Sequence, residues 1–311
     1  MMNLSARLPH TLAAIVAGAL SFGVMTTGLS AEEIKIQHTK GETTLPAKPK
    51  NVVVFDLASL DTLNALGVEV SGVPTARFPE YMAKYGSDKY EKVGTLFEPN
   101  YEAVNAAKPD LIIVGGRSSA KYDALAKIAP TIDLTVDTKD YVGSVKRNVQ
   151  TLASLFDKQA EADAQLAKLE QSMAAVRQDA AKAGKGLLVL TTGGKMSAYG
   201  PGSRFGLLHG AYGVVPAVEG LATTNHGQAV NAEFILKTNP DWLFVIDRDI
   251  ATGRSEGAAK KVLDNDLVAQ TTAWKNNQVV YLDPVSWYLI GGGLTAMQNS
   301  VDQIAKAFAK K

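Results

Sequence analysis

The sequence predicts an α/β fold in which two βα lobes are bridged by one long α-helix. Three observations indicate this fold. One pattern occurs twice, at residues 100–117 (NYEAVNAAKPDLIIVGGR) and residues 231–248 (NAEFILKTNPDWLFVIDR), and the two copies align without a gap. Short apolar runs alternate with helical patterns on both sides of the chain's middle. The middle itself, residues 141–183, contains no proline and repeats apolar residues at helical spacing.

Each copy of the repeat predicts the same local structure. An Asn-x-Glu start and a Pro-Asp pair frame a short helix, an apolar strand follows, and an arginine, Arg117 or Arg248, ends the copy. A repeat of this size indicates two similar lobes. Because open α/β sheets bind ligands outside the carboxyl ends of their strands, two facing lobes would point both arginines into one cleft.

The first lobe, expected over residues 32–140, reads as a Rossmann-like βα unit. A helix over residues 59–66 is expected to end at Gly67. Buried strands should surround it, because short apolar runs alternate with helical segments. The expected strands cover residues 50–56, 68–73, 111–114 and 132–136.

A long helix over residues 159–182 should follow a break at Asp157-Lys158. At 1.5 Å per residue it would be roughly 35 Å long, about the width of a small domain. We expect it to bridge the lobes and to permit only small hinge motions, although packing on one lobe alone is the alternative. The second, Rossmann-like lobe, expected over residues 184–311, begins with a strand at 186–192 and closes with a helix at 291–311.

The N-terminus predicts export. Residues 1–31 combine one cation, Arg7, with an apolar run and small residues, which is typical of a secretory signal peptide; a membrane anchor is the alternative. The chain has no cysteine, so disulfides, thiol catalysis and a lipid anchor on cysteine are excluded. The formal net charge is only +1, which gives no indication of nucleic-acid binding. We therefore expect a soluble protein, most simply a periplasmic monomer.

Several polar residues are candidates for a binding site. Arg204 lies in a glycine-rich loop, residues 199–206, and joins Arg117 and Arg248 as a third arginine. A surface salt bridge is the alternative for each, above all for Arg248 between Asp247 and Asp249.

His226 and Tyr288 lie in two further segments that the sequence predicts to be loops. Phenolate suits the hard Fe(III) ion, and imidazole is acceptable to it. A histidine bonded to the backbone and a half-buried tyrosine are the alternatives. Trp287 and Tyr199 are candidate aromatic walls or core residues, and Arg77 is a candidate for the rim of the cleft or for plain solvent exposure.

These features together resemble the class III periplasmic binding proteins, which serve ATP-binding-cassette (ABC) importers of iron–siderophore complexes, haem and cobalamin. The resemblance covers about residues 34–311 and rests on the signal peptide, the strand–helix opening, the repeated Pro-Asp strand and the bridging helix. The local patterns at the three arginines, His226 and Tyr288 are similar to those of catecholate siderophore binders of the enterochelin (enterobactin) type.

The resemblance implies that Arg117, Arg204 and Arg248 line the cleft and meet an anionic ferric catecholate siderophore. It also implies that His226 and Tyr288 are iron ligands when a tetradentate bis-catecholate leaves coordination sites open. No permanent cofactor is expected, since Fe(III) arrives as part of the siderophore complex.

Glu102 and Glu233 occupy equal positions in the two repeats, in the first turn of each expected helix. The helix dipole favours negative charge there, so a structural role is one interpretation. The resemblance implies another, in which one acidic residue on each lobe docks onto an inner-membrane ABC permease.

Other functions find less support. Ser118-Ser-Ala-Lys121 matches the Ser-x-x-Lys motif of penicillin-binding enzymes, but the companion motifs are absent, so a secreted hydrolase is disfavoured and no catalysis is expected. A hydroxamate siderophore is nearly neutral, and haem or cobalamin would not need three arginines. Carriers of these ligands remain the alternatives to a catecholate carrier.

Overall fold

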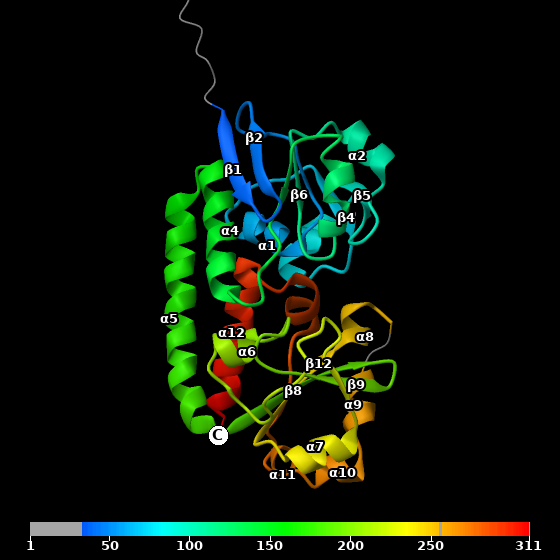
Figure 1. The fold of residues 1–311 in the computed structure, drawn as a ribbon, viewed down its shortest axis with the longest axis vertical. Helices are drawn as coiled ribbons and strands as arrows, with labels where there is room; N and C mark the ends of the chain where they lie inside the picture. The colour runs from blue at the N-terminus through cyan, green and yellow to red at the C-terminus, as the bar shows by residue number, and fades with distance from the viewer. Residues whose placement is uncertain (1–32, 255–256, 311) are drawn as a thin grey trace, which may run out of the picture. The chain divides into compact units, whose positions relative to one another are not determined.

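In the part of the chain that the computed structural model describes, residues 33–254 and 257–310, two β-sheets form the centres of two lobes (Figure 1). The predicted signal peptide, residues 1–31, lies outside the described residues. No helix among the described residues combines the length and apolar character needed to cross a bilayer.

The first sheet has five parallel strands in the order β5-β4-β3-β6-β7. A hairpin of β1 and β2 precedes it and is tied to β7 by the bond from the Thr39 amide to the Asp133 carbonyl, 3.1 Å. The elements are β1 (Ile34–His38), β2 (Gly41–Leu45), β3 (Val52–Val54), α1 (Leu57–Ala65), β4 (Gly72–Thr75), η1 (Glu80–Gly86), β5 (Glu91–Thr95), α2 (Tyr101–Ala107), β6 (Leu111–Val114), η2 (Ser119–Lys121), α3 (Tyr122–Leu125) and β7 (Thr131–Asp133).

The structure corrects the strand expected over residues 68–73. Val68 and Val70 are buried, but strand β4 begins only at Gly72, where the chain lies beside Val53 of β3. A Cβ atom on Gly72 would lie 2.8 Å from the Val53 side chain and 2.9 Å from that of Val93. The apolar residues before Gly72 are therefore buried without forming the backbone hydrogen bonds of a strand.

The second sheet has six strands. Strands β8, β10, β12 and β13 are parallel, whereas β9 and β11 run antiparallel to their neighbours. The elements of this half are β8 (Lys185–Thr192), β9 (Lys195–Tyr199), α6 (Leu207–Gly210), β10 (Val215–Pro216), β11 (Gln228–Val230), α7 (Ala232–Thr238), β12 (Trp242–Asp247), α8 (Arg248–Ala251), α9 (Ala258–Leu263), α10 (Asp266–Ala269), α11 (Thr272–Lys275), β13 (Val279–Tyr281), η3 (Val285–Ile290) and α12 (Leu294–Phe308).

The two sequence repeats adopt the same structure, as predicted. Asn100 and Asn231 cap α2 and α7, and each side chain accepts a hydrogen bond from the amide three residues later, at 3.1 and 2.9 Å. The helices end at Lys108 and Asn239, which adopt left-handed φ angles of 48° and 43°. Equivalent caps thus fix the point at which each chain segment enters its strand.

The aspartate of each Pro-Asp pair fastens its strand to the neighbouring one. Asp110 accepts hydrogen bonds from the amides of Lys50 and Asn51 at 2.9 Å, and Asp241 accepts one from the amide of Lys185 at 2.7 Å. These bonds hold β6 beside β3 and β12 beside β8, which aligns the carboxyl ends of both strand pairs.

The long middle helix contacts both lobes, as expected. Helix α4 (Tyr141–Leu155) ends at a break where Asp157 has a φ angle of 56°, and α5 (Gln159–Ala183) then runs beside α4 and α12 (Figure 1). Near its start, Gln165 donates to the carbonyl of Ala65 in α1 at 3.0 Å. Near its end, Arg177 donates to the carbonyl of Ala211 at 2.9 Å. The lobe boundaries expected at residues 140 and 184 stay a prediction.

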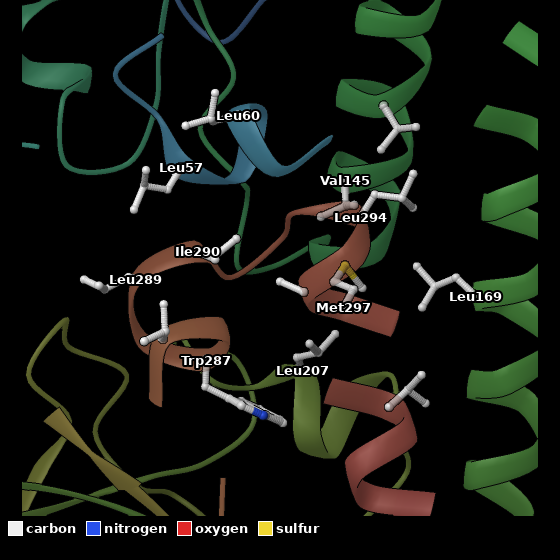
Figure 2. Close-up of a cluster of buried hydrophobic side chains, with 14 of the residues drawn as sticks. Leu57, Leu60, Val145, Leu169, Leu207, Trp287, Leu289, Ile290, Leu294 and Met297 are labelled. Atoms are coloured by element: carbon white, nitrogen blue, oxygen red, sulfur yellow. The ribbon is translucent and has the colours of Figure 1, made fainter. Parts of the chain in front are cut away.

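A continuous apolar core joins the two halves. Figure 2 shows the part of this core where α1, α4, α5, α6, η3 and α12 meet. The side chains labelled there are Leu57, Leu60, Val145, Leu169, Leu207, Trp287, Leu289, Ile290, Leu294 and Met297. Close packing of this kind resists continuous deformation, so the core supports the segment that carries residue 288.

A buried carboxylate fixes the start of the C-terminal helix. Asp61 of α1 is fully buried, and its Oδ2 accepts hydrogen bonds from the amides of Thr295 (2.8 Å) and Ala296 (3.2 Å) in the first turn of α12. A Cβ atom on Gly293 would lie 2.5 Å from this oxygen, so the close approach requires glycine. Burial raises the pKa of Asp61 from 3.8 to about 6, although the hydrogen bonds it accepts lower the pKa in part.

This raised pKa predicts a loss of stability as the pH rises through the interval from about 4 to about 6. The folded state binds the Asp61 proton more tightly than the unfolded state, so ionisation costs the folded state more. Asp61→Asn keeps an acceptor oxygen without a proton to titrate. From about pH 4 to pH 7, the unfolding free energy of the wild type should fall by roughly 2–3 kcal/mol relative to that of the variant.

Urea unfolding followed by circular dichroism at several pH values measures this difference. If the difference in unfolding free energy between the two proteins stays constant from about pH 4 to pH 7, the raised pKa of Asp61 is contradicted.

Candidate functional site

Three arginines from three separate segments surround one tyrosine. Arg117 follows β6, Arg204 follows β9, and Arg248 opens α8 directly after β12. Their guanidinium carbons lie 5.1, 4.7 and 5.5 Å from the ring centroid of Tyr288. All four side chains are half-buried. The structure thus brings together four of the residues that the sequence analysis selected.

Tyr288 lies in a π-helix, η3, and this corrects the expectation of a loop. The Gly291 amide donates to the Ser286 carbonyl at 2.9 Å, which is the wide hydrogen-bond spacing of a π-helix. Single π turns often occur at functional sites. The other residues of η3 are buried: Val285, Ser286, Trp287, Leu289 and Ile290. Tyr288 alone in this segment is half-buried.

The C-terminal carbonyls of η3 hold two of the arginines. Arg117 donates to the carbonyl of Tyr288 at 2.5 Å and to that of Leu289 at 3.1 Å, and Arg204 donates to the carbonyl of Tyr288 at 3.1 Å. A helix end leaves such carbonyls without helical partners and attracts cations. Because Arg117 belongs to the first lobe, this contact also joins the first lobe to η3.

The phenol of Tyr288 is held by the third arginine. Arg248 donates from Nε to the Tyr288 hydroxyl at 2.7 Å and from Nη1 to the Thr192 hydroxyl at 3.0 Å. Burial acts to raise the pKa of Tyr288, but the Arg248 hydrogen bond and the charges of the three arginines outweigh it and lower the pKa. The site therefore makes the Tyr288 phenol more acidic than an ordinary tyrosine.

The salt-bridge alternative for Arg248 is wrong. Asp247 is buried and accepts hydrogen bonds from the amides of Asp249, Ile250 and Ala259. Asp249 is buried too and accepts one from the Gly193 amide at 2.7 Å. Both carboxylates are thus occupied by backbone amides.

None of the three arginines forms an ion pair among the residues that the structure describes. Burial and the charge of nearby Arg204 lower the pKa of Arg117, although Tyr288 and the buried Asp56 act to raise it. Guanidinium groups nevertheless remain charged at any working pH. The arrangement is a cluster of three cations around one acidic phenol, and it can bind a multiply charged anion that also offers flat rings.

Tyr199 and Trp287 belong to the core, the alternative that the sequence left open. Tyr199 is 3% exposed and contacts Phe205 edge-on at 4.7 Å, while Trp287 is 5% exposed and contacts Tyr212 at 6.0 Å. Both side chains pack in the core next to the site, and neither exposes a ring face that could contact a ligand.

His226 lies on an exposed turn before β11, a strand that pairs with β9 and so leads back to the loop of Arg204. Its ring has no hydrogen-bond partner within the described part of the chain. The alternative, a histidine bonded to the backbone, is therefore wrong. Its role as an iron ligand stays a prediction. Glu102 and Glu233 are both exposed in the first turns of α2 and α7, at equivalent places.

Sequence reasoning missed three contributors to this site. Thr192 positions Arg248, Phe205 lies under the Arg204 guanidinium at 4.7 Å, and the η3 carbonyls hold Arg117. Thr192 ends a predicted strand, so the rule that ligands bind at strand carboxyl ends could have found it. Arg77 is exposed, as expected, but it also donates to the carbonyl of Ile250 across the two lobes at 3.0 Å.

Comparison with known proteins identifies the family. The family model described as periplasmic binding protein matches residues 52–285. The petrobactin-binding protein YclQ of Bacillus subtilis is 44% identical over 284 residues, covering 90% of this chain and 89% of YclQ. The crystal structure of YclQ has a TM-score of 0.87 to this chain.

Two further relatives are similar over most of their length. The ferric-anguibactin-binding protein FatB of Vibrio anguillarum is 32% identical, covering 88% of this chain and 87% of FatB. The periplasmic catecholate-siderophore binding protein VctP of Vibrio cholerae is 34% identical with a TM-score of 0.84, covering 88% of this chain and all of VctP. The chain therefore belongs to the periplasmic binding protein family, whose two lobes are joined by a long helix.

Proposed function

We propose that this protein captures a ferric catecholate siderophore outside the cytoplasm and delivers it to an inner-membrane ABC permease. The observation that carries the proposal is the convergence of Arg117, Arg204 and Arg248 on Tyr288 without a carboxylate partner among the described residues. Such a cluster is costly to assemble unless an anion neutralises it, because the three positive charges around one ring repel one another.

The chemistry of a ferric catecholate matches this cluster. The complex is multiply anionic and carries delocalised aromatic rings. Guanidinium groups donate hydrogen bonds to catecholate oxygens, stack on rings and keep their charge. The relatives point the same way, since YclQ binds petrobactin, FatB binds ferric anguibactin and VctP binds a catecholate siderophore. A hydroxamate complex is close to neutral, so we expect a carrier for it to need fewer cations.

We further propose that His226 and Tyr288 bind the iron of a tetradentate bis-catecholate. Such a ligand leaves two of six coordination positions on Fe(III) open, and a phenolate and an imidazole can fill them. The lowered pKa of Tyr288 supports this role because a phenol must lose its proton to ligate iron. The exposed, unbonded ring of His226 supports it as well.

The remaining steps of the proposal concern delivery. The relatives belong to a family of substrate-binding proteins, and this chain likewise binds its cargo without catalysing a reaction. It acts as a soluble, unlipidated monomer after removal of residues 1–31. Glu102 and Glu233 dock onto arginines of the permease; their exposure at equivalent places on two lobes fits a partner with two-fold symmetry.

Removal of a site arginine should weaken siderophore binding. Arg117→Ala and Arg248→Ala should each cost about 1.5–3 kcal/mol of binding free energy, the scale of a charge-assisted hydrogen bond. Fluorescence quenching with a ferric bis-catecholate measures the affinity. Arg147→Ala is the matched control, because Arg147 is exposed and pairs with Asp140 at 2.8 Å. Equal affinities of all these proteins would refute the site.

Cargo class and iron ligation can be separated in one series of titrations. A ferric bis-catecholate, a ferric tris-catecholate and a ferric hydroxamate are each added to the mature protein. The catecholates should bind tightly, and only the bis-catecholate should show a shifted charge-transfer band, which Tyr288→Phe and His226→Ala should each remove or reduce. Preference for the hydroxamate would overturn the proposed cargo, while a band that both variants retain would overturn ligation.

The acidity of Tyr288 should depend on Arg248. Arg248→Met removes the hydrogen bond to the phenol and one nearby charge, so the pKa of Tyr288 should rise. Ultraviolet titration of tyrosine absorbance measures this, and subtraction of the Tyr288→Phe spectra assigns the signal to residue 288. An unchanged titration would show that Arg248 does not control the phenol.

A further inference from the structure

Two exposed aromatic residues are close to Glu102 in the sequence. Among the residues that the structure describes, the large apolar side chains with high exposure are Phe97 (57%), Tyr101 (39%) and Val215 (41%). Isolated exposed apolar residues are ordinary on protein surfaces, whereas a group of them marks an interaction site. Phe97 and Tyr101 are close in sequence to each other and to Glu102, and Val215 is remote in sequence.

The backbone that carries Phe97 is rigidly built. The Thr95 amide donates to the Glu98 carbonyl at 2.9 Å, and the Thr95 hydroxyl accepts from the amides of Phe97 (3.3 Å) and Glu98 (3.0 Å). Gly94 has a φ angle of 119°, and a Cβ atom there would lie 2.4 Å from the Glu98 carbonyl oxygen. Phe97 therefore stands at the tip of a tight turn and is not a residue of a loose loop.

The helix that follows orders the other two residues. Asn100 caps α2, which makes Tyr101 its first residue and Glu102 its second. Turn and cap follow one another without a break, so the three side chains share one stretch of ordered backbone.

The charges around these rings favour a cationic partner. Glu98 pairs with Lys121 at 2.8 Å. Glu102, by contrast, has no hydrogen bond or ion pair with any residue in the ranges 33–254 and 257–310. A free carboxylate on the same short segment as two exposed aromatic rings fits an arginine, whose guanidinium pairs with the carboxylate and stacks on a ring. An anionic membrane surface is disfavoured, because it would be repelled by Glu102.

The second lobe lacks this aromatic pair. In the repeat, Glu233 corresponds to Glu102, but the positions that correspond to Phe97 and Tyr101 hold Gln228 and Ala232. The two acidic residues are thus equivalent in charge and place, while their surroundings differ in apolar character.

We infer that Phe97, Tyr101 and Glu102 form one docking surface, which binds an arginine-bearing, partly apolar segment of the permease. This inference rests on the proposed function and deepens it. Aromatic residues and arginine dominate the binding energy of protein interfaces. The first lobe therefore anchors the complex through apolar burial and charge, whereas the second lobe contributes through the charge of Glu233.

The test compares the full mature chain with a Phe97→Ser/Tyr101→Ser double variant and with Val215→Ser, a matched loss of an exposed apolar side chain. Two affinities are measured for each: for a ferric bis-catecholate by fluorescence quenching, and for the purified cognate permease in phosphatidylcholine nanodiscs. The double variant should keep its siderophore affinity and lose about tenfold or more in permease affinity. Val215→Ser should match the wild type in both.

Each other outcome has its own meaning. Permease affinity that is unchanged in the double variant overturns the docking surface. A loss that appears equally on nanodiscs without permease assigns the rings to lipid, and a loss of dimer in sedimentation assigns them to a second copy of this chain; either overturns the inference. Failure of the wild type to bind any ferric siderophore would instead refute the proposed function.

Discussion

The constraint on which the rest of this structure depends is the placement of three like charges around one ring. Arg117, Arg204 and Arg248 would repel one another, and the fold offsets this repulsion with oriented dipoles. The carbonyls of Tyr288 and Leu289 at the end of η3 accept hydrogen bonds from Arg117 and Arg204, and the Tyr288 phenol accepts one from Arg248. A π-helix with a packed apolar face is thus the scaffold of a cationic surface.

This arrangement means that the arginines are ordered before any ligand arrives. Their rotamers are already restricted by η3, by Thr192 and by Phe205, so little side-chain entropy remains to be lost on binding. The aspartates on either side of Arg248 contribute indirectly. Asp247 and Asp249 bind backbone amides and shape α8 and the loop at Gly193, so the Arg248 guanidinium has no carboxylate partner within the described ranges.

The sequence revealed those parts of the fold that repeat. The caps Asn100 and Asn231 and the strand-fastening residues Asp110 and Asp241 occur at equal places because equal local geometry needs equal hydrogen bonds. The positions of Arg117 and Arg248 follow from the same rule, since a strand's carboxyl end is visible in its apolar pattern.

Other parts depend on contacts that no local pattern encodes. The π-helix at Tyr288 arises from packing between distant segments, and its sequence looks like a loop because one π turn has no periodicity to detect. Strand β4 starts at Gly72 rather than at Val68 because pairing with Val53, and not hydrophobicity, decides where a strand begins. The burial of Tyr199 and Trp287 likewise follows from tertiary packing.

The origin of the three arginines has a consequence for how cargo is discharged. Arg117 comes from the first half of the chain, whereas Arg204, Arg248 and Tyr288 come from the second. Guanidinium groups are already fully protonated at physiological pH, so acidification cannot change the charge of the three arginines. A separation of the two halves would weaken the site, because it would move Arg117 away from the bound anion while Arg204 and Arg248 stay in place. A partner that contacts both halves would therefore release the anion by displacing Arg117 through a small hinge motion, with no change in protonation.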